Sequence, residues 1–493
     1  MGEVTDRGTT PSGPGRREGK ERLAFVTGKL AEFSLRKTLE GLAPRAGFDY
    51  TVSVLPISVA ALMTPPWVAA HLKLESAPDR VVLPGHCRGD LAPVSAAAGA
   101  PAVLGPKDLR DLPAWLSGAP AERTDGVRPA GYGAHSLEII AEINHANRLT
   151  AADLLAAARR YRADGADVID LGCEPGRIWE GLGEAVGMLR AEGLRVSADT
   201  MEPREMALAA RGGAELILSV SGPTLAAARD LGCAVVVIPD RPSSLEGLQV
   251  SVARLEEWRV PYRIDPVLEP IGFGFAASLG RYLEARRLFP RSEMMMGVGN
   301  LTELTDADSA PINVVLAGFC AEAGIRSVLT TEVINWARTS VRELDLARRL
   351  VHHAVSQRTL PKHLEPDLLL LRDEAVREHG AEVLERLAAE LRDPSVRIFA
   401  EGGAIHAMSS RFHLKGADPF VLFEEMAAAD PRTIGDPSHA FYLGFEMQKA
   451  LTALTLGKEY RQDQPLRWGF LTRQEASHLE RKGKRRKPGE ARG

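Results

Sequence analysis

Polar side chains recur at the ends of apolar runs between residues 137 and 333 of this 493-residue chain. Asp199 and Asp265 carry the clearest chemistry among them. A carboxylate can accept two parallel hydrogen bonds from a ligand edge that presents two adjacent N–H groups, and its charge strengthens both bonds. Asparagine and aspartate also cap helices, but so many positions of one kind indicate a shared pocket. The full set is Asn144, Asp170 with Glu174 just beyond it, Asp199, Ser219, Asp240, Asp265, Asn300 and Glu332.

The apolar runs that position these side chains alternate with helical patterns. The runs are LEIIAEIN, DVIDLG, RVSAD, LILSVS, AVVVIP, YRID, MMMGVG and SVLTTEV. Eight strands that are each followed by a helical segment are typical of a (β/α)8 TIM barrel, which we predict over residues 135–360. Active sites of this fold lie at the C-terminal ends of the strands, where all of the polar positions would meet.

Two smaller domains flank the predicted barrel. Before it, strand and helix patterns alternate from RLAFVTG to RVVLPG, which predicts an α/β domain with a parallel sheet. After it, a helical stretch around Glu365–Leu391 leads into a small α/β or α+β domain. The predicted boundaries are a disordered tail at 1–20, the N-terminal domain at 21–118, a linker at 119–134, the C-terminal domain at 361–479 and a basic tail at 480–493.

Composition narrows the classes of partner and compartment. The formal net charge is −4, which argues against nucleic acid or an anionic membrane as a partner. No run of 18 apolar residues occurs, so we expect no membrane span, and the first residues lack the apolar core of a signal peptide. The four cysteines are widely spaced without a CxxC pair, which fits a reducing cytoplasm.

Three motifs inside the predicted barrel resemble those of dihydropteroate synthase and its pterin-binding relatives. ADGADVIDLGCEPG is similar to the family's second-strand motif, VSADT to its third-strand motif, and YRIDP followed by IGFGF to the motif that places an aspartate before a Gly-rich loop. MGVGNLTELTDADSAPIN and RSVLTTEVINWARTSVRELDLARRL resemble motifs of the three-part dihydropteroate synthase-like proteins of archaea and methylotrophic bacteria. The resemblance implies a pterin-binding barrel that acts in tetrahydromethanopterin biosynthesis and one-carbon metabolism.

The resemblance also implies roles for individual residues. The pterin would contact Asp199, Asp265, Ser219 and Asn300. Diphosphate would contact Asn144, Gly297, Gly299, Thr330 and Thr331, with Mg²⁺ also on Asn144; loops after the seventh and eighth strands often bind phosphate in this fold. The acceptor would contact Glu174, Arg177 and Arg338. The family joins a hydroxymethyl-dihydropterin diphosphate to an arylamine and commonly dimerises, so we expect a transferase with these two small molecules and a second copy of the chain as partners.

Several positions depart from the family pattern. IGFGF continues with two alanines where the family has a lysine, GVGN replaces a Ser-Arg-Lys motif, and the long second loop is reduced to GCEPGRIWEG. These changes favour a different acceptor, the larger and charged ribofuranosyl-aminobenzene phosphate. GVGN also resembles the turn of pterin-dependent methyltransferases, although the chain has no DxHxxG cobalamin motif. A pterin-binding component without catalysis, part of a biosynthetic complex, is the third hypothesis.

Overall fold

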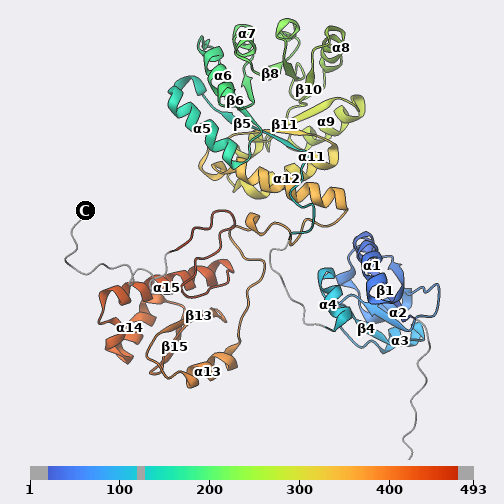
Figure 1. Ribbon diagram of the computed structural model, residues 1–493, viewed down its shortest axis with the longest axis vertical. Helices are drawn as coiled ribbons and strands as arrows, with labels where there is room; N and C mark the ends of the chain where they lie inside the picture. The colour runs from blue at the N-terminus through green and yellow to red at the C-terminus, as the bar shows by residue number, and fades with distance from the viewer. Residues whose placement is uncertain (1–19, 119–127, 476–493) are drawn as a thin grey trace, which may run out of the picture. The chain divides into compact units, whose positions relative to one another are not determined.

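The computed structural model describes residues 20–118 and 128–475 (Figure 1). These residues form two compact units. One holds the N-terminal sheet together with Ala354–Leu360, and the other holds Arg128–His353 and the chain from Pro361 onward. The predicted tails, apart from Lys20, lie outside the described residues, as do residues 119–127 of the predicted linker. No helix in the described ranges is long and apolar enough to cross a membrane.

The N-terminal domain is a parallel four-stranded sheet with helices on both faces. Its strands are β1 (Arg22–Gly28), β2 (Asp49–Leu55), β3 (Arg80–Leu83) and β4 (Ala102–Leu104), in the order β2-β1-β3-β4. Its helices are α1 (Glu32–Ala46), α2 (Pro65–His71), α3 (Ala92–Ala98) and α4 (Leu112–Ser117). Successive residues of β1 point to opposite faces, so Leu23 and Phe25 join one apolar cluster while Ala24 and Val26 join the other. The predicted α/β class is confirmed, and β4 is an additional short strand.

The central domain is a closed eight-stranded parallel barrel, as predicted, because β12 pairs with β5. The strands are β5 (Glu138–Ile143), β6 (Val168–Gly172), β7 (Val196–Asp199), β8 (Leu216–Val220), β9 (Ala234–Val237), β10 (Tyr262–Ile264), β11 (Glu293–Gly297) and β12 (Ser327–Thr330). The helices are α5 (Ala151–Asp164), α6 (Leu182–Ala191), α7 (Pro203–Gly212), α8 (Leu248–Trp258), α9 (Phe275–Leu288), α10 (Gly299–Thr302), α11 (Ser309–Ala323) and α12 (Ser340–Gln357). A 3-10 helix, Leu225–Asp230, takes the place of an α-helix between β8 and β9.

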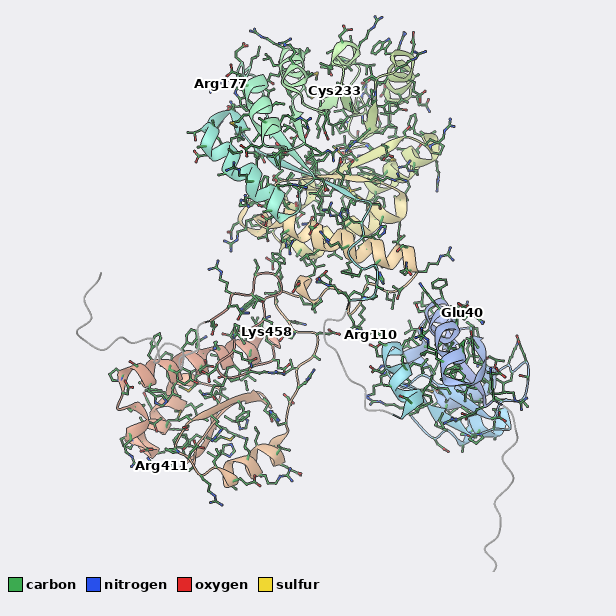
Figure 2. The ribbon with its side chains drawn as sticks, in the orientation of Figure 1. Glu40, Arg110, Arg177, Cys233, Arg411 and Lys458 are labelled. Carbon is green, nitrogen blue, oxygen red and sulfur yellow. The ribbon has the colours of Figure 1, made fainter. Side chains whose placement is uncertain are left out.

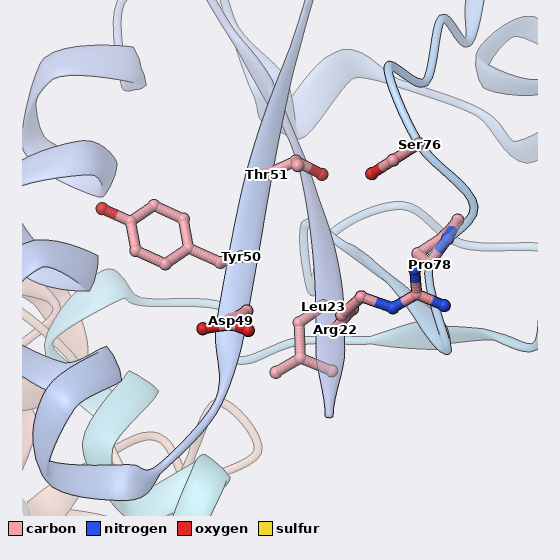
Figure 3. Close-up of a pocket in the computed structure, with 7 residues that line it drawn as sticks. All are labelled: Arg22, Leu23, Asp49, Tyr50, Thr51, Ser76 and Pro78. Carbon is pink, nitrogen blue, oxygen red and sulfur yellow. The ribbon is translucent and has the colours of Figure 1, made fainter. Parts of the chain in front are cut away.

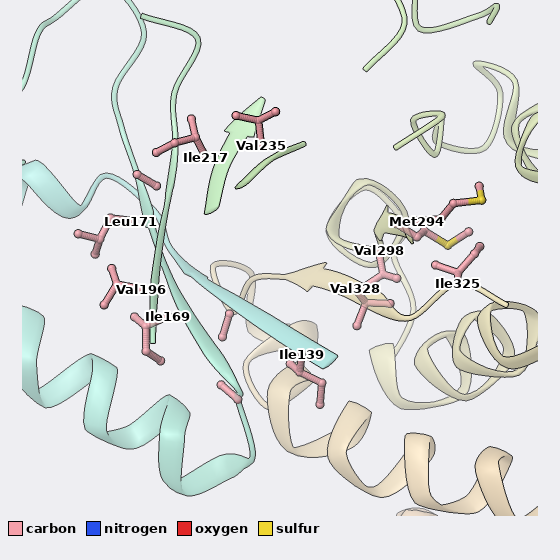
Figure 4. Close-up of a cluster of buried hydrophobic side chains, with 14 of the residues drawn as sticks. Ile139, Ile169, Leu171, Val196, Ile217, Val235, Met294, Val298, Ile325 and Val328 are labelled. Carbon is pink, nitrogen blue, oxygen red and sulfur yellow. The ribbon is translucent and has the colours of Figure 1, made fainter. Parts of the chain in front are cut away.

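Alternation along the strands divides the barrel into an outer and an inner set of side chains. Ile139, Ile169 and Val235 belong to the large cluster between strands and helices (Figure 4). Their neighbours in sequence, Ile140 and Val168 among them, belong to a separate cluster that fills the barrel interior. The inner residues two positions further along β5 and β6 are therefore directed to the C-terminal mouth, on top of an apolar layer.

The C-terminal domain packs three helices with an antiparallel sheet and is thus of the α+β type. Its strands are β13 (Arg397–Glu401), β14 (Ala404–Met408) and β15 (His413–Gly416), paired in that order. Its helices are α13 (Ala381–Glu390), α14 (Pro419–Ala429) and α15 (Pro437–Leu456). Alternate strand residues such as Ile398 and Ile405 meet Leu422 and Leu443 of the helices in one core.

The helix predicted around Glu365–Leu391 is wrong in its first half. Within this stretch only a 3-10 turn at Pro366–Leu368 and the later helix α13 are helical. The residues between them are held from elsewhere: the Lys458 ammonium donates to the Leu370 carbonyl at 2.8 Å, and the Glu459 N–H donates to Asp373 at 2.9 Å (Figure 2 labels Lys458). Tertiary hydrogen bonds therefore override the local helix preference.

Candidate functional site

Three carboxylates from adjacent strands meet at the C-terminal mouth of the barrel. Glu142 of β5 lies opposite Asp170 of β6, and Asp199 of β7 lies opposite Gly172 of β6. One oxygen from each of the three acids lies within 4.8 Å of one from each of the others. A Cβ at Gly172 would overlap the Glu142 carboxylate, so the glycine makes the room that this arrangement requires.

Asp170 is the deepest member of this group. Its side chain is fully buried, and its Oδ1 accepts a 2.5 Å hydrogen bond from the Ser197 hydroxyl. Its Oδ2 has no hydrogen-bond partner among the described residues. Val168, two residues earlier, belongs to the apolar layer below. Burying a carboxylate oxygen without a hydrogen-bond partner beside such a layer lowers the stability of the fold. This arrangement is therefore explained by ligand binding better than by stability.

Burial and mutual repulsion raise the pKa values of the group. Burial, followed by the charges of Asp199 and Glu303, raises the pKa of Glu142 to about 8. Burial and the charges of Asp199 and Glu142 raise the pKa of Asp170 well above its usual range. Burial and the charge of Asp265 raise the pKa of Asp199 to about 6. Near neutral pH and without a bound cation, Glu142 therefore holds a proton while Asp199 is mostly ionised.

Asp265 forms a second buried carboxylate subsite beside this group. It follows β10, and its Oδ1 accepts hydrogen bonds from the Tyr282 hydroxyl at 2.6 Å and from the Val267 N–H at 2.8 Å. Burial raises the pKa of Asp265 to about 6, against the lowering effect of these two donors and of the Gly297 backbone. The structure thus holds the side chain firmly and leaves Oδ2 directed toward the glycine at the end of β11.

The structure places the predicted phosphate-binding residues Thr330 and Thr331 in different surroundings. Thr331 is buried with its hydroxyl unpartnered among the described residues, and its methyl group lies 3.5 Å from the point where a Cβ of Gly299 would be. The Thr330 side chain is also buried but is directed toward helix α12, where its hydroxyl forms a 2.8 Å hydrogen bond with the Ser340 hydroxyl. A Glu303 oxygen lies 3.6 Å from that same point at Gly299, so a carboxyl occupies the neighbourhood predicted for diphosphate.

The other predicted pterin and metal contacts line the same end of the barrel. Asn144 follows β5, and its Oδ1 is buried without a partner among the described residues. The Asn300 amide donates to the Leu268 carbonyl at 2.9 Å, and its nitrogen lies 3.9 Å from the Cβ position of Gly297, as does Asp265 Oδ2. Ser219 lies on β8, half-buried.

The predicted acceptor contacts are less closely grouped. Glu174 accepts hydrogen bonds from Arg148 and Asn147, and the first of these is the main reason that its pKa is lowered to about 2. Arg177 and Arg338 are exposed, and neither side chain forms an ion pair with the residues that the structure describes. Figure 2 shows Arg177 at the periphery near α5 and α6.

Glu142 and Glu303 were absent from the predicted site, and Asp170 had no assigned role there. A signal for Glu142 was present in the sequence, since it lies two residues after Ile140 on the inner face of the strand. Glu303 follows the short helix α10, where no strand periodicity applies. Its proximity could not be inferred from spacing.

Two hollows elsewhere lie at the opposite ends of their sheets. One, of about 120 Å³, is lined by Arg22, Leu23, Asp49, Tyr50, Thr51, Ser76 and Pro78, where β1 and β2 begin (Figure 3). The other, of about 220 Å³, lies where barrel strands begin and includes the ion pair of Glu138 with Arg263. Ligand sites in both fold types lie at the C-terminal ends of the strands, so we place the site at the barrel mouth.

Comparisons with known proteins give relatives for different parts of the chain. A family of unknown function (DUF6513) matches residues 21–107. An uncharacterized protein of Methanocaldococcus jannaschii is 26% identical, over 90% of this chain and 98% of its own length. The similar solved structures include three dihydropteroate synthases.

That of Yersinia pestis with a pterine-sulfa conjugate is 20% identical, covers 45% of this chain and 94% of its own, and gives a TM-score of 0.36. That of Xanthomonas albilineans with 7,8-dihydropteroate is 22% identical, covers 45% and 93%, and gives 0.37. That of Thermus thermophilus is 24% identical, covers 44% and 94%, and gives 0.36. The barrel fold of this chain is established by its own strand pairing.

Proposed function

We propose that the barrel binds a pterin and joins its methylene carbon to an arylamine, with release of diphosphate, in tetrahydromethanopterin biosynthesis. The observation that supports this proposal most strongly is a pair of carboxyl groups, the partly buried Asp199 at the end of β7 and the buried Asp265 just after β10. They are close enough that the charge of one raises the pKa of the other. A pterin presents adjacent N–H donors on its 2-amino-4-oxo-pyrimidine edge, which a buried carboxylate can accept in parallel.

The chain's own residues would act mainly by positioning. Asp265, held by Tyr282 and the Val267 N–H, would fix one edge of the ring, and Asp199 would face another. Displacement of diphosphate by an amine requires the two reactants to be held in line, which is worth several kcal/mol of the barrier. The unpartnered oxygen of Asn144 fits Mg²⁺, which would supply charge neutralisation for the leaving group.

A binding measurement tests the pterin site first. Full-length protein is titrated with hydroxymethyl-dihydropterin by calorimetry, and Asp265→Asn should weaken binding by roughly 10- to 100-fold because a charge-assisted hydrogen bond is lost. Asp230→Asn, an exposed carboxylate at the end of the 3-10 helix Leu225–Asp230, is the control. Equal affinities of the parent and Asp265→Asn would contradict the site.

A reconstitution then tests the reaction. The protein is supplied with hydroxymethyl-dihydropterin diphosphate, Mg²⁺ and either p-aminobenzoate or ribofuranosyl-aminobenzene phosphate. We expect diphosphate release with the second acceptor, because the short loop GCEPGRIWEG leaves more space than the family's long loop. Release with neither acceptor, together with tight pterin binding, would overturn the transferase proposal.

One observation favours a second candidate, a pterin-binding component without catalysis. The Glu303 carboxyl lies beside Gly299, where the diphosphate was predicted, and it would repel that anion unless a cation intervened. In this alternative, the protein would bind the pterin alcohol at least as tightly as the diphosphate, with or without Mg²⁺.

A further inference from the structure

We propose that Glu142, Asp170 and Asp199 bind one hard divalent cation, of the Mg²⁺ or Mn²⁺ type, at the floor of the barrel mouth. This site uses three side chains that the predicted magnesium position at Asn144 did not include. Cation binding can be measured without any pterin, so a failure of this proposal is distinguishable from a failure of the proposed reaction.

The geometry brings the ligand atoms to the right range. One oxygen of each acid lies within 4.8 Å of the others. Mg²⁺ takes oxygen ligands at about 2.0–2.1 Å in an octahedron, so its ligand oxygens are separated by roughly 3 to 4 Å. A small inward movement of side chains from three neighbouring strands satisfies this requirement. The donor set is oxygen alone, which suits Mg²⁺, Mn²⁺ or Ca²⁺ better than the softer transition metals.

The hydrogen bonding of Asp170 points to a missing partner. The side chain is fully buried, and the Ser197 hydroxyl holds Oδ1 at 2.5 Å. Oδ2 is left without a hydrogen-bond partner among the described residues, in a group whose other members are also acids. A cation would satisfy that oxygen, while Ser197 would orient the carboxylate as outer partners of metal ligands usually do.

Gly172 and Asn144 line the side of the three acids that faces away from the apolar layer. Gly172 is opposite Asp199 in the sheet, and any side chain there would overlap the Glu142 carboxylate. The Asn144 Cα lies 3.3 Å from the same Cβ position, and the Asn144 Oδ1 is buried without a hydrogen-bond partner among the described residues. Asn144 is therefore the neutral oxygen donor that we add to the proposed set.

Protein cations do not already neutralise the three acids. None of the ion pairs among the described residues includes Glu142, Asp170 or Asp199, and several arginines of the barrel pair with other acids. Arg281 pairs with Glu269, Arg148 with Glu174 and Arg160 with Glu332. Three mutually close carboxyl groups with no basic partner lose their protons when a divalent cation binds and then match its charge.

Titration with Mn²⁺ tests the proposal directly. Full-length protein freed of metal with a chelator and then desalted is titrated at pH 7.5, and free Mn²⁺ is followed by its electron paramagnetic resonance signal. We expect one site per chain with a Kd below about 100 µM, a range that carboxylate-rich sites commonly reach. Competition with Mg²⁺ and with Ca²⁺ then shows which hard cation the site prefers.

Variants connect the bound ion to the named side chains. Asp170→Asn keeps the shape of the buried side chain and should weaken Mn²⁺ binding at least 10-fold, and Glu142→Gln should do the same. Asp230→Asn, an exposed carboxylate at the end of the 3-10 helix Leu225–Asp230, should bind Mn²⁺ as the parent does. Circular dichroism of each variant establishes that the barrel has folded.

Two results would overturn the proposal. One is a parent protein that binds no Mn²⁺ up to 1 mM. The other is a folded Asp170→Asn or Glu142→Gln protein that binds Mn²⁺ with parental affinity, which would place the ion elsewhere. If Asp170→Asn fails to fold, Glu142→Gln decides alone, since the Glu142 side chain is only partly buried.

Discussion

Glu142→Gln should change how the stability of the metal-free barrel depends on pH. The pKa of Glu142 is about 8 in the folded barrel, against 4.5 for an unperturbed glutamate. Between these values the folded state binds a proton that the unfolded state has released. The free energy of unfolding therefore falls as the pH rises, and this contribution is complete below pH 4.5 and lost above pH 8.

The size of the effect follows from the shift. At about 1.36 kcal/mol per pKa unit, the full shift corresponds to ~4–5 kcal/mol. Water at the barrel mouth and relaxation around the carboxylate reduce this figure, so we expect the parent to lose about 2–3 kcal/mol between pH 5 and pH 8 through this group. Glutamine cannot ionise, so Glu142→Gln should be more stable than the parent at pH 8 by about that amount and similar to it at pH 5.

Hydrogen exchange measured by mass spectrometry is the suitable assay, because peptides from β5 to β8 report on the barrel separately from the two flanking domains. Samples are kept in a chelator at pH 5 and pH 8, with rates corrected for intrinsic exchange. Ile140→Val, in the apolar layer below, is the control and should cost about 1 kcal/mol at both pH values. Parallel pH dependences for the parent and Glu142→Gln would refute the reasoning.

Three further substitutions test other parts of the structure. Gly172→Ala should cost about 1–3 kcal/mol in barrel stability, measured by hydrogen exchange, because its Cβ would overlap the Glu142 carboxylate. Tyr282→Phe removes a donor that lowers the pKa of Asp265, so that pKa should rise above about 6 and the acid limb of pterin affinity, measured from pH 5 to 8, should move upward. Arg348→Ala should destabilise the barrel by about 3–5 kcal/mol in the same exchange experiment, because it leaves two carboxylates without their buried partner.

Each of these has a matched control. Gly187→Ala, in α6 with only a carbonyl oxygen at 3.9 Å from its Cβ position, should be neutral or slightly stabilising. Tyr262→Phe removes a hydroxyl bonded to Glu256 and should leave the pterin profile in place. Arg349→Ala should cost less than Arg348→Ala, because the Arg349 side chain is 35% exposed against 3%. Equal effects within any pair would contradict the corresponding assignment.

The barrel could be predicted because its pattern is local and repeated. Each apolar run and the helix after it carry their own periodicity, and closure of the ring follows from the number of repeats. β4 lacked such a signal, since three residues are too few to show alternation. The stretch after Glu365 has a helical sequence pattern but is not helical, because Lys458 and Glu459 form hydrogen bonds with it. These residues lie far along the chain, so the local pattern could not indicate them.

The site was predictable only where a side chain ends a strand. Asp199 ends β7 and Asp265 directly follows β10, with β8 and β9 between them in the barrel, and both lie at one mouth. Glu142 lies within a strand. An acidic residue in a strand is normally predicted to face solvent, unless the strand is known to line the inside of a barrel. Glu303 depends on how the loop after β11 folds back, which only the structure reveals.

The acids at the mouth would attract one end of the proposed substrate and repel the other. The pterin edge donates protons and suits Asp199 and Asp265, whereas diphosphate would approach Glu142 and Glu303. Two like charges 4 Å apart repel by about 4 kcal/mol at the effective dielectric of a protein surface, so an ionised Glu303 would oppose the anion, and a protonated Glu142 would offer it no attraction. A divalent cation bound to the carboxylates would change this repulsion into an attraction for the diphosphate. Under the proposed function, pterin recognition would not need the cation, whereas transfer from a pterin diphosphate would. The order in which cation and diphosphate bind therefore distinguishes the proposed enzyme from a pterin-binding component.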